Sequence, residues 1–186
     1  MLLGPPVIEE WNPAGPRREQ DLLELSGVLH AAVHAGASVS FILPFSLEDA
    51  LAFWRDKVLQ GVKDHTRVVL VARSEGEIVG TVQLLLDTPP NQPHRAEVAK
   101  LLVHPDARRR GIARALMEEI ENVARRAGRT LITLDTRTGD SAEPLYRSMG
   151  YVLVGVIPRY ARDPESRTLE ATSILYKELV HLTEPQ

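Results

Sequence analysis

The sequence predicts an α/β fold in a single domain over residues 1–186. β-type runs rich in valine, isoleucine and leucine alternate with runs that carry apolar residues at helical spacing. The length of 186 residues suits one domain with a sizeable core, and 44% hydrophobic and 25% charged residues are typical of a globular protein. No internal repeat or change of composition marks a domain boundary.

The first part of the chain predicts one strand and two helices. A β-type run covers 7–11, and apolar residues at helical spacing over 22–32 predict a helix that ends in the glycine- and serine-rich stretch 36–40. Ser46 with Asp49 three residues later predicts a capping box at the start of the second helix. The expected apolar stripe of that helix is Leu47, Leu51, Trp54 and Val58.

The middle of the chain predicts a β-hairpin and a further strand. The β-branched and apolar runs 67–72 and 78–86 flank a turn at 74–77. A loop with three prolines, 88–94, separates this hairpin from the next strand, 97–103. We expect that loop to be irregular, because proline removes backbone donors.

The second half predicts a long helix over 112–127, with an apolar face that recurs every three or four residues. Glu121 and Arg125 stand four residues apart and are expected to pair on its exposed side. The remaining predicted elements are a strand at 131–136, a short helix at 142–149, and closing strands at 151–157 and 168–176 joined by a polar loop at 158–167.

The turn between the strand 97–103 and the long helix predicts an anion site. The first backbone N–H groups of a helix have no partner within the helix, and the helix dipole favours negative charge there. Gly111 permits a close approach of the backbone, and the small Ala113 leaves room for a ligand. Gly111 is not followed by the Lys-Ser/Thr pair of a P-loop, which argues against a nucleotide hydrolase.

Two motifs resemble signatures of the GCN5-related N-acetyltransferase (GNAT) family. Arg108, Gly111 and Ala113 follow the pattern Arg-x-x-Gly-x-Ala after a strand that ends Val-x-Pro, and Leu-Tyr-Arg-Ser-Met-Gly-Tyr at 145–151 is similar to the second signature. The resemblance implies the GNAT acyl-CoA N-acyltransferase fold, a mixed and mostly antiparallel sheet flanked by helices. In that fold a central parallel strand pair splays apart, and acetyl-CoA, the co-substrate, places its pantetheine arm in the splay.

The resemblance also implies which residues hold acetyl-CoA. The backbone amides after Arg108 would bind the pyrophosphate, and the arginine side chains would contact a phosphate or form a solvated positive rim. Gly139 replaces the asparagine that many family members carry, so Asp140 or Ser141 would substitute for it. The full expected set is Leu101, Leu102, Val103, Arg108, Arg109, Arg110, Gly111, Ile112, Ala113, Arg114, Asp140 and Ser141, with no metal.

Three residues are expected to be catalytic. Tyr146 takes the position of the family's general acid, which protonates the departing thiolate; the alternative is a core tyrosine. Glu97 and Asp135 are carboxylates within apolar strands, where acidic residues are unusual. On neighbouring strands they would lie side by side, attract a cationic amine and remove its proton. The alternative for both is an ion pair with Lys100 or Arg137, or exposure to solvent at the strand ends.

Composition limits the partners. The net charge of −3 gives no reason to expect nucleic acid, and the absence of cysteine excludes disulfides and a cysteine nucleophile. The sequence starts without a signal-peptide pattern, and no apolar run approaches the roughly 18 residues of a membrane span, so we expect a cytoplasmic protein. The sequence does not decide between a monomer and a homodimer. His30 and His34 lie one helical turn apart but have no third ligand nearby, so we expect ordinary histidines rather than a metal site.

These observations predict an N-acetyltransferase that moves the acetyl group of acetyl-CoA to a primary amine of a small molecule. Direct attack in a ternary complex is expected, because there is no cysteine to form a covalent intermediate. The segments 95–101 and 134–136 are most similar to tabtoxin-resistance type enzymes, which acetylate a toxin amine. The alternatives are a non-catalytic acyl-CoA-binding or regulatory module and a protein or peptide N-acetyltransferase.

Overall fold

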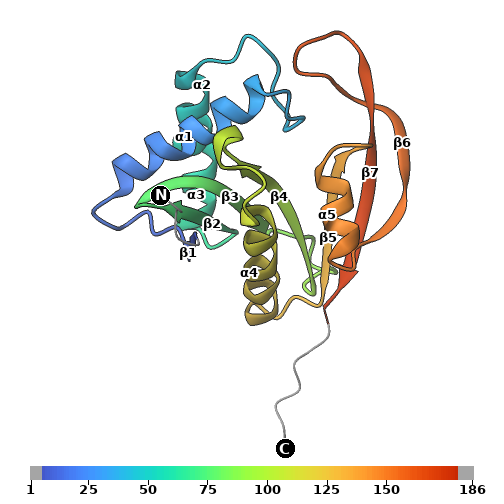
Figure 1. Cartoon of the computed structure of the whole chain (residues 1–186). Coiled ribbons are helices and arrows are strands. Elements are labelled where there is room, and N and C mark those ends of the chain that lie inside the picture. The colour runs from blue at the N-terminus through green and yellow to red at the C-terminus, as the bar shows by residue number, and fades with distance from the viewer. Residues whose placement is uncertain (1–5, 180–186) are drawn as a thin grey trace, which may run out of the picture.

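Seven strands form one sheet in the order β1-β2-β3-β4-β5-β7-β6 (Figure 1). The computed structural model describes residues 6–179, so residues 1–5, on which the signal-peptide expectation rests, lie outside the described part. The strands are β1 Val7–Glu10, β2 Arg67–Ser74, β3 Glu77–Leu85, β4 Arg95–Val103, β5 Leu131–Arg137, β6 Val152–Arg162 and β7 Leu169–Glu178. The helices are α1 Arg18–His34, α2 Leu47–Ala52, the π-helix η1 Phe53–Val58, α3 Leu59–Lys63, the 3-10 turn η2 Pro105–Ala107, α4 Ile112–Arg126 and α5 Ala142–Ser148.

The centre of the sheet is a parallel strand pair, β4 and β5, while the other neighbouring strands are antiparallel. The predicted mixed, mostly antiparallel sheet is therefore confirmed. β4 and β5 pair only over 95–97 and 131–133, ending at Glu97 and Thr133. Beyond these residues the two strands part in a V (Figure 1), which is the expected splay.

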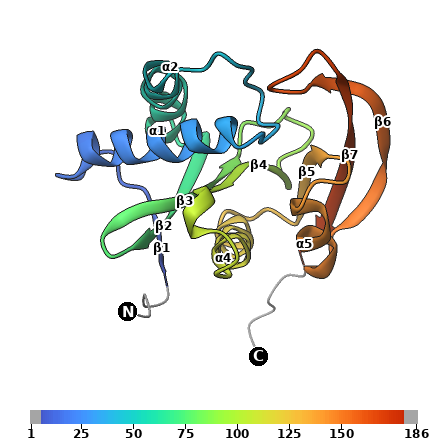
Figure 2. The same ribbon diagram turned by 45° about the horizontal axis from the view of Figure 1, so that its top comes forward.

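Helices cover both faces of the sheet (Figure 2): α1, α2 and α3 lie on one face, and α4 and α5 on the other. The predicted apolar stripe of α4 faces the sheet and explains why this helix packs there. The core on the α4 face is centred on Leu116, Met117, Ile120, Ile132 and Leu134, and the core on the α1 face on Leu25, Leu29, Trp54, Val69 and Val71.

A single-residue bulge changes which way β4 faces. Gln83 pairs with Ala99 and Thr81 with Leu102, so β4 has one more residue than β3 between these pairs. Lys100 lies in this bulge with a φ of 53°. As a result, Val98 packs in the α4-face core while Leu102 packs in the α1-face core, although regular alternation would place both on one face.

The second helix is not the continuous α-helix that we expected. Its capping box is confirmed, because Asp49 N–H donates to Ser46 Oγ at 3.0 Å and Ser46 N–H donates to Asp49 Oδ2 at 2.9 Å. The π-helix η1 then separates α2 from α3, and its wider turn alters the spacing of the buried positions. Trp54 and Val58 are fully buried, but Leu47 is 50% exposed, so the predicted stripe is wrong at its start.

The first half of the expected polar loop 158–167 is strand. β6 continues to Arg162, and Ala161 pairs with Glu170 and Arg162 with Leu169. The connection to β7 is therefore only residues 163–168. This far part of the hairpin is largely exposed, so its sequence lacks the apolar alternation by which strands are recognised, while backbone pairing still forms.

The pair Glu121–Arg125 is not on the exposed side of α4. Glu121 is 5% exposed, and its carboxylate accepts two hydrogen bonds from Lys177 Nζ of β7, both at 2.7 Å. Arg125 Nη2 lies 3.5 Å from the same carboxylate. The expectation was wrong because β7, which is distant in sequence, covers this side of the helix.

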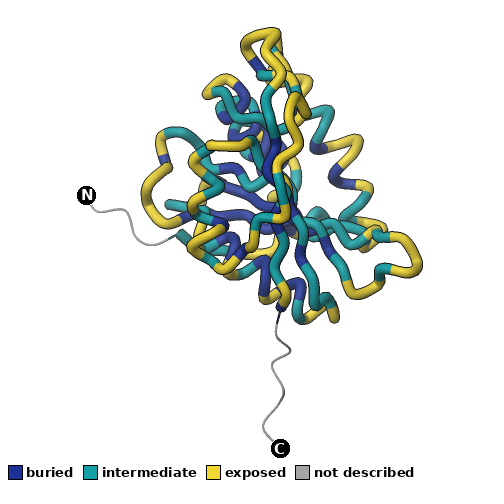
Figure 3. Tube along the Cα trace, turned by 90° about the vertical axis from the view of Figure 1, so that its right-hand side faces the viewer, coloured by how far each residue is buried: buried dark blue, intermediate teal, exposed yellow. Residues whose placement is uncertain are grey.

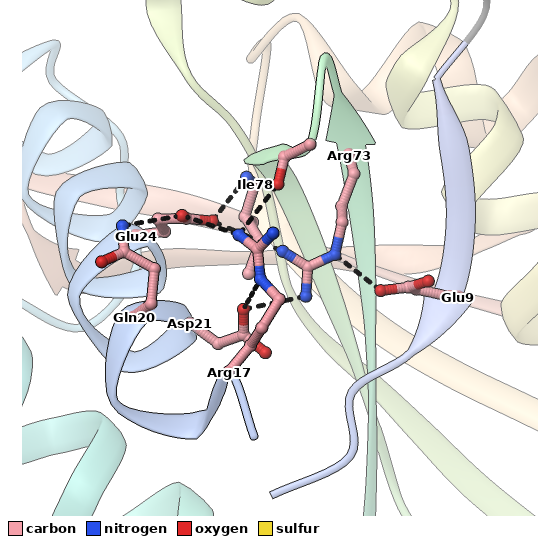
Figure 4. Close-up of polar contacts among 8 residues, drawn as sticks. Glu9, Arg17, Gln20, Asp21, Glu24, Arg73 and Ile78 are labelled. Carbon is pink, nitrogen blue, oxygen red and sulfur yellow. Dashed lines mark hydrogen bonds and ion pairs between the residues drawn. The ribbon is translucent and has the colours of Figure 1, made fainter. Parts of the chain in front are cut away.

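A polar cluster fastens α1 to the first strands (Figure 4). Arg73 of β2 reaches Glu9 of β1 at 2.6 Å and Asp21 of α1 at 2.9 Å. Glu24 accepts from the Ile78 backbone N–H at 2.9 Å. These contacts hold the first half of α1, so that its C-terminal end projects over β4.

Buried residues follow the middle of the sheet and the helix faces against it, and exposed residues gather in the connections (Figure 3). Among the helices in the described part of the chain, none has the length and apolar character required to cross a membrane.

Candidate active site

A cavity of about 670 Å³ opens at the splay of β4 and β5. Its walls come from the end of α1 and the segment after it, from β4, from the turn before α4, from the end of β5 and from α5. The expected site residues that line it are Leu101, Leu102, Val103, Arg108, Arg109, Gly111, Ile112, Ala113, Arg114, Asp135, Asp140, Ser141 and Tyr146. Two expected residues, Glu97 and Arg110, are not in its lining.

One end of this cavity is the N-terminus of α4. Arg109 and Gly111 have positive φ angles of 63° and 76°, which turn the backbone tightly into the helix. No side chain caps α4, so its first-turn amides keep their donors available. Arg114 lines the same end, whereas Arg110 turns away and donates to the Asp106 backbone carbonyl at 3.1 Å. These features fit a pyrophosphate group.

The middle of the cavity is the side of β4 that β5 leaves uncovered. Because the β4–β5 ladder ends at Glu97, the backbone groups of Leu101 to Val103 that point toward β5 have no partner strand. A buried, unpaired backbone group is costly, so an extended ligand with its own amides would be stabilised here. This part of the cavity therefore fits the pantetheine arm of acetyl-CoA.

Tyr146 reaches the cavity from α5. The residue is 5% exposed, and its ring lies 5.8 Å from the ring of Tyr151. Burial, with smaller contributions from Asp140 and Asp135, raises the pKa of Tyr146 well above that of an ordinary phenol. The hydroxyl therefore carries its proton at neutral pH, as a general acid must.

Asp140 and Ser141 lie at the start of α5, where the asparagine was expected to be replaced. Ser141 N–H donates to Asp140 Oδ1 at 2.6 Å, and Asp140 Oδ2 lies 3.6 Å from Arg137 Nη2. Arg137 also reaches Asp163 of the β6–β7 connection at 3.4 Å. The side chain of Asp140 therefore contributes contacts that link the start of α5 to the end of β5.

The two carboxylates lie on the α1 face of the sheet, but they are offset. Glu97 is in register with Thr133, so Asp135 is two residues further along β5, where the strands have begun to part. Asp135 lines the cavity and accepts from Thr172 Oγ1 at 3.3 Å, whereas Glu97 lies 3.8 Å from Arg95 Nη1. Asp135 is thus the carboxylate that faces the cavity directly.

Sequence reasoning missed two parts of this site. One is Lys100, whose side chain lines the cavity and which was considered only as an ion-pair partner; a lysine inside an apolar strand was the available signal. The other is the 36–45 strap, the segment between α1 and α2. Its Leu43 N–H donates to the Pro164 carbonyl at 2.9 Å, which joins it to the β6–β7 connection (Figure 1). No local pattern predicts this contact.

His30 and His34 pack against each other with ring centroids 4.0 Å apart, and His34 Nδ1 is 2.9 Å from the His30 carbonyl. Within residues 6–179 no group of three or more histidine, aspartate or glutamate side chains is placed to hold a metal ion.

Known proteins share this architecture. Residues 32–151 match the family model described as the acetyltransferase (GNAT) family. An IAA acetyltransferase of Azospirillum brasilense is 36% identical over 102 residues, which are 54% of this chain and 65% of that relative, so the match spans slightly less than two thirds of its length.

Two solved structures have a TM-score of 0.74 with this chain. The ribosomal-protein-alanine N-acetyltransferase of Brucella melitensis is 24% identical, over 93% of this chain and 99% of its own. The protein yncA of Salmonella typhimurium, solved with its cofactor acetyl-CoA, is 17% identical, and the match covers 98% of this chain and 99% of yncA. The family match covers more than half of the chain and agrees with the splayed strand pair and the uncapped turn before α4, and the chain therefore belongs to the acetyltransferase (GNAT) family.

Proposed function

We propose that this protein transfers the acetyl group of acetyl-CoA to a primary amine of a small molecule, by direct attack in a ternary complex. One observation carries the proposal: a single cavity joins the uncapped N-terminus of α4, the open side of β4, Tyr146 and Asp135. Bound acetyl-CoA would supply an activated acetyl thioester. The uncapped amides and the open backbone of β4 would hold it with the reacting end near Tyr146 and Asp135.

The side chains have separate roles in this proposal. Asp135 attracts the cationic amine and takes its proton, and Glu97 assists from the adjoining position on the same face. Tyr146 donates its proton to the departing sulfur, because its raised pKa keeps the phenol protonated until a thiolate forms. A non-catalytic acyl-CoA-binding module would not require an acid and a carboxylate in the same cavity.

The 36–45 strap favours a small acceptor over a protein. Residues 36–40 of the strap line the cavity, and Leu43 bonds the strap to Pro164 of the β6–β7 connection. In this proposal the strap therefore restricts the approach of a large acceptor. A peptide would need an open groove there. The alternative, a protein or peptide N-acetyltransferase, is supported by the likeness to the Brucella melitensis enzyme. The tabtoxin-resistance subtype, the cytoplasmic location and the monomeric or dimeric state stay predictions.

Calorimetric titration with acetyl-CoA and thiol release with a panel of small amines and N-terminal peptides test the proposal. We expect acetyl-CoA to bind and small amines to be acetylated in preference to peptides. Binding without turnover of any acceptor would favour the non-catalytic module, and turnover restricted to peptides would favour the protein acetyltransferase.

A further inference from the structure

A lysine without a carboxylate partner lies in the cavity on the α1 face. Lys100 Nζ is 3.2 Å from Ser40 Oγ of the 36–45 strap and 5.8 Å from the centre of the Phe41 ring. Lys177 is 2.7 Å from Glu121, whereas Lys100 forms no ion pair with any carboxylate of residues 6–179. An ammonium group has three N–H donors, so two of these have no acceptor in the described protein.

Three other charges act on Lys100 through space: the carboxylates of Asp135 and Glu97, and the guanidinium of Arg67. Arg67 of β2 donates to Gln83 Oε1 at 2.6 Å and likewise forms no ion pair within the described chain. Burial lowers the pKa of Lys100; Asp135 opposes this shift, Arg67 adds to it, and Glu97 opposes it. A partly buried cation is costly unless it is paired, so an anion that entered the cavity here would be stabilised.

The geometry points to an acceptor that carries a carboxylate as well as an amine, an amino acid or a close analogue. Lys100 would bind the carboxylate, and Asp135, which lines the same cavity, would receive the ammonium group. A small acceptor is proposed because residues 36–40 of the strap line the cavity and its Leu43 is bonded to Pro164 of the β6–β7 connection. This inference rests on the proposed acetyl transfer and names its substrate class, with Lys100 as the specificity-determining residue.

The test compares matched probes that differ only in the carboxyl group. Methionine, phenylalanine and lysine are each supplied as the free amino acid, the primary amide and the decarboxylated amine, and thiol release gives kcat/KM. The amide is less basic than the amino acid and the decarboxylated amine more basic, so a preference for the acid over both cannot come from amine basicity. Thermal shifts of the CoA complex with the same probes measure binding without turnover.

We expect the acid to be preferred at least tenfold, and Lys100→Met to reduce that ratio by about tenfold, which is about 1.4 kcal/mol. Lys100→Arg keeps the positive charge and should retain most of the preference. Lys63→Met is the matched control, because Lys63 is an exposed lysine at the end of α3. The KM for acetyl-CoA reports whether each variant is folded.

Each outcome decides the question. Two results would overturn the inference while leaving acetyl transfer intact: equal kcat/KM for acids and amides with the unaltered protein, or an acid preference that Lys100→Met does not reduce. In either case the charge of Lys100 would serve only to offset the negative charges of Asp135 and Glu97. Acid-dependent thermal shifts without turnover would support the carboxylate site and overturn the proposed acetyl transfer. If no probe shows an acid preference in either measurement, the carboxylate site is absent.

Discussion

Replacing Gly111 tests the anion site before α4 most directly. Gly111 has a φ of 76°, and a Cβ added there would meet no atom within 4 Å, so a side chain at this position fits without a clash. Any side chain at this position lowers the free energy of unfolding by about 1 kcal/mol, because the backbone is left-handed there. Aspartate and asparagine tolerate that conformation better than other residues. Gly111→Asp and Gly111→Asn have the same shape and differ in one negative charge.

The magnitude of the charge effect follows from the position. A carboxylate on Gly111 would stand roughly 5 Å from a pyrophosphate held by the first-turn amides, and one pair of unit charges at that distance repels by about 3 kcal/mol at an effective dielectric constant of about 20. Screening by salt and the exposure of the turn reduce this value to about 1.5 kcal/mol. Gly111→Asp should therefore weaken acetyl-CoA binding at least tenfold relative to Gly111→Asn.

The assay is calorimetric titration of both variants with acetyl-CoA at low and at high salt, with thermal unfolding as the control for folding. The difference between the variants should shrink at high salt, because the effect is electrostatic. Equal affinities for the two variants at low salt, with both folded, would refute the reasoning and place the pyrophosphate elsewhere.

Further predictions concern the other charged and polar groups. Tyr146→Phe should lower kcat by about a hundredfold with little change in acetyl-CoA affinity, and unaltered turnover would mean that water supplies the proton. Asp135→Asn should lower kcat/KM for a cationic amine more than Glu97→Gln does, because Asp135 lines the cavity; the reverse order in pH–rate profiles would contradict the proposed roles. Glu121→Gln should destabilise the fold by about 2–3 kcal/mol and lower Tm by roughly 5–10 °C, since it leaves a largely buried ammonium without its counter-charge. As the pH rises, the preference for acceptors that carry a carboxylate should disappear at a pH below the ordinary pKa of a lysine, because burial lowers the pKa of Lys100. A preference that stays constant up to alkaline pH would contradict the role of Lys100.

Local features of the chain were predictable from the sequence. The apolar repeat of α4, the capping box at Ser46 and the glycine turn at Gly111 each depend on residues within one or two helical turns of one another. The parallel strand pair was predictable through the family motifs, which lie within 97–151. For the same reason, most of the expected acetyl-CoA contacts line one cavity.

Tertiary structure decided what depends on contacts between distant segments. Glu121 is buried because β7 reaches α4, and the 36–45 strap, part of which lines the cavity, is joined to the β6–β7 connection because Leu43 meets Pro164. Neither contact leaves a periodic signal in the sequence, because each joins residues more than fifty positions apart.

The sequence by itself predicted the class of fold, the glycine turn before α4 and the place of Tyr146 on α5, since these follow from short-range patterns and from the family motifs. Only the tertiary structure decided which side chains share the acceptor end of the cavity. One extra residue at Lys100 reverses the alternation of β4, and the splay beyond Glu97 leaves Asp135 facing the cavity. A bulge and the end of a strand ladder are set by the balance of packing on both faces of the sheet, which no single stretch of sequence contains.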